Sequence, residues 1–334
     1  MIKTMTLRRA VIIWSVLLLL AVTVFLASLA TGSVTLSVAQ LLRVCFGDED
    51  SVAAQIVHTV RIPRAVAGFA CGALLSVAGA LLQILLRNPL ADPYVLGVSG
   101  GAASFALGAM MLSLPTLYIN LCAFAGALAA IMMLLFATRR TWLQRASHVA
   151  SSRLLLTGVV LATGWGALII LLMTLAPERA LRGMVFWLVG DLSSAAHGWF
   201  ALIVLAGVLV VSLSVATQLN VLLRGEATAY ALGVAVVPLR RRIYWLASLA
   251  TAAAVSTAGS VGFIGLVVPH GVRLLLGNDQ RMLLPAAALA GGALTMMADL
   301  VARTVVAPVQ LPLGAITALI GVPVFLWLLA SERR

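Results

Sequence analysis

The sequence predicts an all-α protein that crosses a membrane about ten times and forms one transmembrane domain over residues 1–334. Hydrophobic residues make up 63% of the 334 positions. Charged residues are only 10% of the chain, against about 25% in soluble globular domains. Apolar runs of roughly 20 residues, the length of a bilayer-spanning helix, recur from one end of the chain to the other.

Apolar runs of spanning length follow one another in order. The first, residues 10–29, comes after a basic N-terminal stretch, and its length predicts a first span rather than the core of a cleaved signal peptide. The others are residues 65–86, 117–137, 154–175, 199–217, 244–268, 283–301 and 313–330. Two shorter apolar segments, near residues 94–112 and 263–276, bring the expected number of spans to about ten.

The net charge of +12 is explained by topology. With a cytoplasmic N terminus and ten spans, the C terminus is cytoplasmic too. The cytoplasmic side then carries 16 of the 22 lysine and arginine residues, and the outer side carries six. This asymmetry follows the positive-inside rule, so the excess of basic over acidic residues does not indicate nucleic-acid binding.

Residues that carry catalytic chemistry are sparse. Ten acidic residues, four single histidines and three cysteines show no metal-ligand spacing, so we expect neither a catalytic group nor a metal site in this chain. Lys3 is the only lysine, and a Walker A loop needs a lysine on the nucleotide phosphates. ATP-driven transport would therefore require a separate motor subunit.

Two other classes of membrane protein remain as alternatives. An ion-coupled secondary transporter, which works without an ATPase, needs ionisable groups near the bilayer midplane. An intramembrane enzyme needs clustered catalytic groups. The acidic residues fall mostly in expected loops or at span ends, which disfavours both alternatives.

The stretch "RNPLADPYVLGVSGG", residues 87–101, interrupts the apolar sequence with charged residues and two prolines. Pro89 and Pro93 prevent a helix from running through it. Asp92 followed by Pro93 is typical of a helix N-cap with proline at the first helical position. The polarity predicts a loop that faces a cavity or a partner, although an ordinary tight turn is the simpler alternative.

The segment "QLNVLLRGEATAYALGVAVVPLRRR", residues 218–242, is the longest polar interruption inside the chain. It predicts a short amphipathic helix from Gly225 to Ala231. Such a helix either docks into the groove of a partner or rests on lipid headgroups.

One face of the expected span at residues 65–86 carries only small residues. Gly68, Gly72, Ser76 and Ala80 recur at four-residue spacing, which places them on one side of a helix. Close helix packing and a smooth pathway wall are both compatible with this pattern.

These segments together resemble the FecCD-type permease family, the membrane subunits of bacterial ABC importers for ferric siderophores, haem and vitamin B12. The resemblance runs nearly end to end. It rests on "RIPR", on "RNPLADPYVLGVSGG", on "SRLLLTGV", on "GFIGLVVPH" and on "LPLGAITALIGVPVF", which begin at residues 61, 87, 152, 262 and 311.

The resemblance implies a type II importer in the bacterial inner membrane. It implies a homodimer of ten-helix subunits with the pathway at the dimer interface, two cytoplasmic ATPase subunits and a periplasmic substrate-binding protein. The chain itself would hold no cofactor, and the partner ATPase would use ATP and Mg. Ferric chelates are the first expectation for the substrate, followed by cobalamin and then haem.

The resemblance also assigns site residues, most closely through the permease of vitamin B12 importers. Arg61 and Arg303 match two outer arginines that receive carboxylates of the binding protein. The cytoplasmic gate of that permease matches Asn88, Leu90, Ser151 and Ser152. At positions 151 and 152 this chain has Ser-Ser, whereas the relative has Thr-Ser. Residues 218–242 match the segment that contacts the ATPase, through Leu223, Arg224, Gly225, Glu226, Ala227, Leu232 and Gly233.

Overall fold

The computed structural model describes residues 7–32, 37, 44, 51–142, 148–193 and 198–331, and in these residues it is helical without any strand. The longer helices are α1 (Leu7–Ala30), α4 (Ile62–Leu86), α5 (Val98–Met111), α6 (Thr116–Trp142), α7 (His148–Leu175), α9 (Gly198–Ser214), α12 (Val236–Ala258), α13 (Ile264–Leu276), α14 (Gln280–Thr304) and α15 (Leu313–Ser331). The shorter ones are α3 (Val52–Ile56), the π-helix η1 (Val57–Arg61), the 3-10 helix η2 (Pro93–Leu96), α8 (Glu178–Val189), α10 (Ala216–Leu223) and α11 (Glu226–Ala231).

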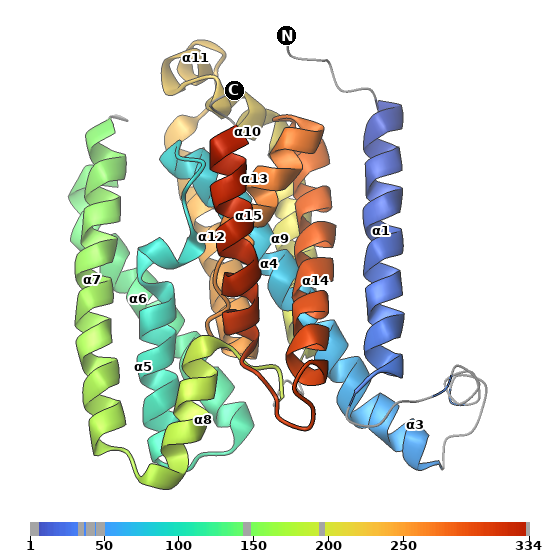
Figure 1. Cartoon of the computed structure of the whole chain (residues 1–334). Coiled ribbons are helices and arrows are strands. Elements are labelled where there is room, and N and C mark those ends of the chain that lie inside the picture. The colour runs from blue at the N-terminus through green and yellow to red at the C-terminus, as the bar shows by residue number, and fades with distance from the viewer. Residues whose placement is uncertain are drawn as a thin grey trace.

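The longer helices form one bundle with two distinct ends (Figure 1). One end, the α11 face, carries α10 and α11, and α1 begins and α15 ends there. The opposite end, the α3 face, carries α3, α8 and the loop that joins α14 to α15. The two ends of the described chain therefore lie on the same face, as an even number of spans requires.

Five helical segments of the described chain are long and apolar enough to cross a membrane by themselves. They are Arg8–Ala30, the continuous helical run Val52–Leu86, Thr116–Arg139, Leu154–Leu175 and Gln280–Thr304. The pair α9 and α10, bent by 62° at their junction, makes a sixth. The helices α5, α13 and α15 are apolar but shorter, so they depend on their neighbours for burial. The chain is a multi-pass helical membrane protein.

Helix α4 is the centre of the bundle, and almost every residue from Ala65 to Leu86 is buried. Its small face packs against α14, because a side chain at Gly72 would meet the Thr295 hydroxyl and the Gly291 carbonyl. Gly79 is similarly close to the backbone of Gly265 in α13. The face of small residues is therefore a helix-packing surface, and its interpretation as a pathway wall is wrong.

The expected span at residues 244–268 is wrong in its second half. Helix α12 ends at Ala258, since Gly259 has a φ of +69° and lies against the Trp187 carbonyl. The Asp191 backbone N–H donates to the carbonyl oxygen of Ala258 at 2.9 Å. A short break follows before α13 begins, and local hydropathy does not reveal it because the break residues are themselves mostly apolar.

Candidate functional site

On the α3 face, the two arginines expected to dock a partner both hold the end of α1. Arg61 is only 4% exposed, and its Nη1 donates to the carbonyl oxygens of Leu29 at 2.5 Å and Ala30 at 3.1 Å. Arg303 Nη2 donates to the Ser28 carbonyl oxygen at 2.8 Å. The last carbonyls of a helix lack intrahelical partners, so the two cations stabilise the C-terminal end of α1.

A buried ion pair joins α4, which begins directly after Arg61, to α14, which carries Arg303. Arg64 Nε and Nη2 donate to the Asp299 carboxylate at 2.8 to 3.1 Å. The side chain of Arg64 is 12% exposed and that of Asp299 is 6% exposed. Arg303 Nε lies 3.6 Å from Asp299 Oδ2. Arg64 therefore binds the Asp299 carboxylate in the bidentate geometry of a guanidinium–carboxylate pair.

The ion pair continues into the loops of the same face. Arg64 Nη1 donates to Gln310 Oε1 at 3.3 Å, and Gln310 Nε2 donates to Asp191 Oδ1 at 2.8 Å. Sequence reasoning missed this network. Helical spacing could have indicated it, because Arg64 lies three residues after Arg61 and Asp299 lies four residues before Arg303, which places each pair on one side of a helix.

The three arginines line one cavity of about 380 Å³. Its walls are Gly32, Ile56, Val60, Arg61, Arg64, Arg303, Pro308 and Gln310. Asp299 pairs with Arg64 and Arg303. With three guanidinium groups in its wall, the cavity suits an anionic group, above all a carboxylate.

On the α11 face, the segment expected to contact an ATPase stands clear of the bundle (Figure 1). Helix α10 ends at Leu223, Gly225 takes a φ of +119°, and α11 begins at Glu226, so the helix predicted from Gly225 to Ala231 is confirmed. Gly233 has a φ of +77° and ends the turn after α11. The outward side of the segment is exposed at Leu223, Arg224, Ala227, Thr228, Tyr230, Leu232 and Gly233.

Glu226 points inward and joins α11 to the rest of the bundle. Its Oε1 accepts a hydrogen bond from Arg240 Nη1 at 3.0 Å and lies 3.6 Å from Arg87 Nη2. Arg240 belongs to α12, and Arg87, with a φ of +49°, caps the C-terminal end of α4. The carboxylate thus connects α11 to two other elements.

A second set of contacts anchors α10. The Asn220 side chain donates to Asp279 Oδ1 at 2.8 Å and accepts from the Gln280 backbone N–H at 2.8 Å. Arg281 Nη2 donates to Thr217 Oγ1 at 2.7 Å. Helix α10 is therefore tied to the beginning of α14, while α11 contacts α12 and the loop after α4.

The loop 87–97 carries two of the four expected gate residues. Asn88 Oδ1 accepts from the Leu90 backbone N–H at 2.9 Å, which folds the turn, and Leu90 is 45% exposed. Ser151 and Ser152 lie near the beginning of α7, and their side chains are outside the described part of the chain. The gate formed by the four residues therefore stays a prediction.

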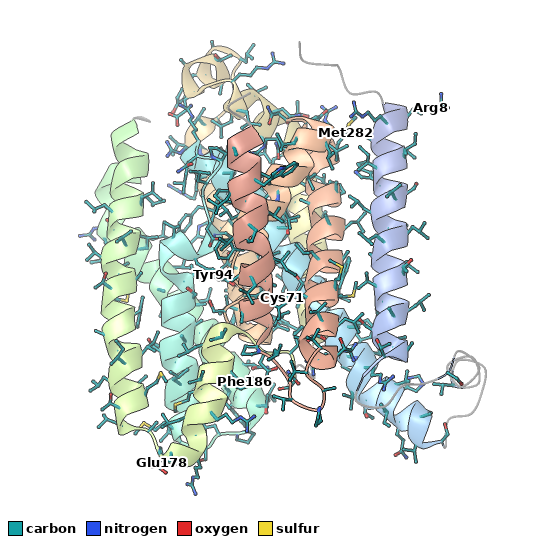
Figure 2. The ribbon with its side chains drawn as sticks, viewed as in Figure 1. Arg8, Cys71, Tyr94, Glu178, Phe186 and Met282 are labelled. Carbon is teal, nitrogen blue, oxygen red and sulfur yellow. The ribbon has the colours of Figure 1, made fainter. Side chains whose placement is uncertain are left out.

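The same loop is anchored deep in the bundle. Asp92 caps η2 by accepting from the Tyr94 backbone N–H at 2.8 Å, as the sequence predicts, although the helix that follows is 3-10. The Tyr94 hydroxyl donates to the Val261 carbonyl at 3.0 Å and accepts from the Val261 N–H at 2.9 Å. Tyr94 and Cys71 lie midway between the two faces (Figure 2). At this depth the polar groups of an irregular backbone need hydrogen-bond partners from the protein, and the Tyr94 hydroxyl provides them for Val261.

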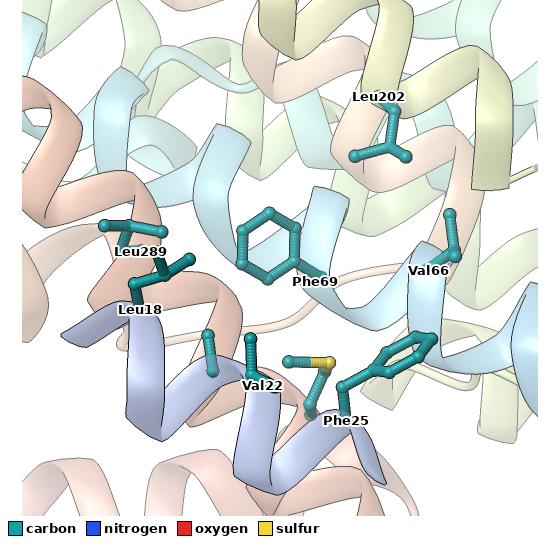
Figure 3. A pocket seen from close by; sticks show the side chains of 9 residues that line it. Leu18, Val22, Phe25, Val66, Phe69, Leu202 and Leu289 are labelled. Atoms are coloured by element: carbon teal, nitrogen blue, oxygen red, sulfur yellow. The ribbon is translucent and has the colours of Figure 1, made fainter. Parts of the chain in front are cut away.

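An apolar cavity of about 240 Å³ lies where α1 meets α4, α9 and α14 (Figure 3). Leu18, Val22 and Phe25 of α1 face Phe69 of α4 across it. Every side chain that lines this cavity is apolar, so it cannot orient a polar substrate. Among the described residues no three histidine, cysteine or acidic side chains come together as a metal-binding group.

Comparison with known proteins gives close relatives over nearly the whole chain. The cobalamin import system permease protein BtuC of Halobacterium salinarum is 44% identical over 286 residues, which cover 83% of this chain and 74% of the relative. The hemin transport system permease protein HmuU of Yersinia pestis is 38% identical over 329 residues, 95% of each chain. A metal-chelate type ABC transporter, solved in an inward-facing conformation, has a TM-score of 0.84 at 30% identity and covers 96% of this chain and 99% of that one.

The bundle, its two polar ends and these similarities define a transport permease. The model of the FecCD transport family matches residues 18–331, and the chain belongs to that family.

Proposed function

We propose that this chain is the membrane subunit of an ATP-binding cassette importer and works as a homodimer with the transport pathway at the subunit interface. The single observation that carries the proposal is the position of α11. The helix projects from one face, with Tyr230 on it and Leu223 and Leu232 beside it exposed, while Glu226 joins it to Arg87 at the edge of the loop 87–97. This arrangement suits a helix that receives movement from a partner and passes it to the bundle.

The α11 face is the cytoplasmic one in this proposal, which places both termini in the cytoplasm and the protein in the inner membrane of a bacterium. The charge distribution supports this orientation. Exposed arginines are frequent at the α11 face, for example Arg8, Arg9, Arg224, Arg241 and Arg242, as expected for cytoplasmic loops.

Two ATPase subunits would bind the α11 faces of the dimer, and they would use ATP and Mg. The contact surface would be formed by residues of the segment 218–242, namely Leu223, Arg224, Gly225, Ala227, Leu232 and Gly233, with Glu226 behind them. The apolar residues exposed on this segment fit a groove on a protein partner. The chain itself would carry no catalytic group.

A periplasmic binding protein would dock on the α3 face. The cavity between Arg61 and Arg303 supports this, because guanidinium groups hold carboxylates with two parallel hydrogen bonds. Both arginines already bond the end of α1, so docking would also act on that helix. A carboxylate of the partner would share the cavity with the Arg64–Asp299 ion pair.

Asn88 and Leu90, with Ser151 and Ser152, would border the cytoplasmic exit of the pathway. The exposed Leu90 and the irregular backbone around it support this position. An irregular segment is tolerated at such a place because it lies against protein or a water-filled cavity.

The substrate would be a bulky metal chelate, and a corrinoid is the first to test. The relatives named above are permeases for cobalamin and hemin, so haem comes second. Ferric siderophores, the first expectation from the sequence, come third because neither of those two relatives is named for them.

An ion-coupled secondary transporter is the alternative. It would need a carboxylate or another ionisable group that exchanges its partner during transport. Asp299 is a buried carboxylate of the kind that such a mechanism uses, but Arg64 holds it in a bidentate ion pair close to the end of α14. That position favours a structural role.

Reconstitution tests the proposal. The chain, its partner ATPase and its binding protein are placed in liposomes, and labelled cyanocobalamin, haem and ferric siderophore are offered in turn. Uptake of one chelate that is lost without ATP is the expected result. Uptake that continues after ATP and the ATPase are removed would establish the secondary transporter instead.

A further inference from the structure

Three consecutive arginines near the beginning of α12 point in two different directions. Arg240 turns inward to Glu226. Arg241 and Arg242 are exposed, and within the described part of the chain neither guanidinium has a hydrogen bond or an ion pair. Each residue of a helix is rotated by about 100° from the previous one, which explains why neighbours separate in this way. Arg241 and Arg242 belong to the segment 218–242 but are not among the residues that we propose to form the ATPase contact.

The two free arginines begin an exposed stripe along α12. Arg241 and Arg242 lie three and four residues after Pro238, Trp245 lies four and three residues after them, and Leu249 lies four residues after Trp245; all five are exposed. From the 1.5 Å rise per residue, Trp245 lies about 5 Å and Leu249 about 11 Å further into the bundle than the arginines. The stripe therefore passes from charged to aromatic to aliphatic as it leaves the α11 face.

A cavity of about 320 Å³ lies on this stripe between α12 and α9. Its walls are Val211, Pro238, Arg241, Arg242, Trp245 and Leu246. The Trp245 ring is held in place by an edge contact with the buried Tyr244, with 6.1 Å between ring centroids. Val211, three residues before the end of α9, supplies an apolar wall on the opposite side.

We propose that this cavity binds one anionic phospholipid. Arg241 and Arg242 hold the phosphate group, because guanidinium groups match phosphate oxygens with parallel hydrogen bonds. Trp245 lies at the level of the glycerol backbone, where tryptophan is enriched in membrane proteins. An acyl chain follows Val211, Leu246 and Leu249 towards the membrane interior.

The order of side chains favours a lipid over a protein partner. The exposed residues of α11 lie outside the bundle, whereas the stripe continues along α12, one of the helices of the bundle. A soluble subunit would meet the arginines but not Leu249. A basic cavity at the cytoplasmic end of neighbouring spans is the kind of place where anionic headgroups bind.

A lipid-binding titration tests the proposal. The complex of this chain with its ATPase is purified in a neutral detergent, and phosphatidylglycerol or phosphatidylcholine is added while native mass spectrometry counts bound lipid. The variant Arg241→Gln/Arg242→Gln removes the two cations. Arg8→Gln/Arg9→Gln is the matched control, because it removes two exposed arginines from the same face, on α1.

The expected result is one phosphatidylglycerol per chain, with an affinity that falls roughly tenfold or more in the Arg241/Arg242 variant and is unchanged in the control. Trp245→Leu lowers the affinity for the same lipid by a smaller factor. Equal affinity of the wild type and the Arg241/Arg242 variant would overturn the proposal, as would an equal loss in the control.

Two further outcomes would also overturn it. Displacement of the lipid by millimolar inorganic phosphate would identify a site for free anions. Dissociation of the ATPase from the Arg241/Arg242 variant, with lipid binding preserved, would identify a protein contact.

Discussion

Glu226 and Arg87 connect two segments that are 139 residues apart, with Glu226 Oε1 lying 3.6 Å from Arg87 Nη2. Glu226 begins α11, and Arg87 ends α4 and opens the loop that carries Asn88 and Leu90. A partner that displaces α11 would act on this loop through that contact. The same carboxylate bonds Arg240 of α12, so it links the three elements.

We expect Glu226→Gln to lower uptake per ATP hydrolysed while the ATPase still binds. The neutral side chain keeps its size but leaves Arg87 and Arg240 without a counter-charge, at a cost of about 1–2 kcal/mol. Transport and ATP hydrolysis are measured together in liposomes. Glu178→Gln, an exposed acid on α8, is the control. Unchanged coupling in Glu226→Gln would contradict the link.

Charge reversal at both arginines, Arg61→Glu with Arg303→Glu, should abolish docking of the binding protein. The reversed charges repel partner carboxylates and also lose the hydrogen bonds to the end of α1. Affinity for the binding protein is measured on the reconstituted complex, and Arg179→Glu on the same face is the control. An undiminished affinity of the double variant, or a loss explained by a lowered melting temperature alone, would refute the docking role.

Asp299→Asn should be strongly destabilising, by about 3–5 kcal/mol, because it leaves the buried Arg64 without its carboxylate. Thermal unfolding in detergent measures the effect. The double variant Asp299→Asn/Arg64→Gln should recover part of the loss, since the two side chains form one interaction. Additive losses would show that the two residues stabilise the protein independently.

Gly72→Ala should destabilise the bundle, and Gly207→Ala should not. An alanine at position 72 meets the Thr295 hydroxyl and the Gly291 carbonyl of α14, and overpacking of this kind costs about 1–3 kcal/mol. Gly207 in α9 has no neighbouring atom within 4 Å of an added methyl group. Alanine there should be neutral or stabilising by up to about 1 kcal/mol. Equal melting temperatures of the two variants would contradict the packing interpretation.

Much of the helical architecture was predictable because a membrane-spanning helix is encoded locally. A run of apolar residues is sufficient to predict α1, α6 and α7. Most of the expected ends of these helices lie within a few residues of the observed ends. The helix after Gly225 was likewise predictable, since polarity and glycine mark its ends. Asp92 was recognisable as a cap because a cap is formed with residues two or three positions away.

The candidate site was predictable only in part. Arg61 and Arg303 came from family resemblance, and the sequence offered no indication that both bond the end of α1. Arg64 entered the sequence analysis only as the last residue of "RIPR", although it makes the buried ion pair of this face. The break after Ala258 was missed because its cause, a close approach of Gly259 to Trp187, lies 72 residues away in the chain.

The sequence by itself determined the class of protein and the order of its longer helices, because both depend on composition or on neighbouring residues. Only the tertiary structure decided which charges meet. Arg64 finds Asp299 across 235 residues, and Arg240 turns to Glu226 while Arg241 and Arg242 face outward. The physical reason is that hydropathy is a local property, whereas an ion pair inside a bundle depends on which helices pack together and on how each is rotated about its axis.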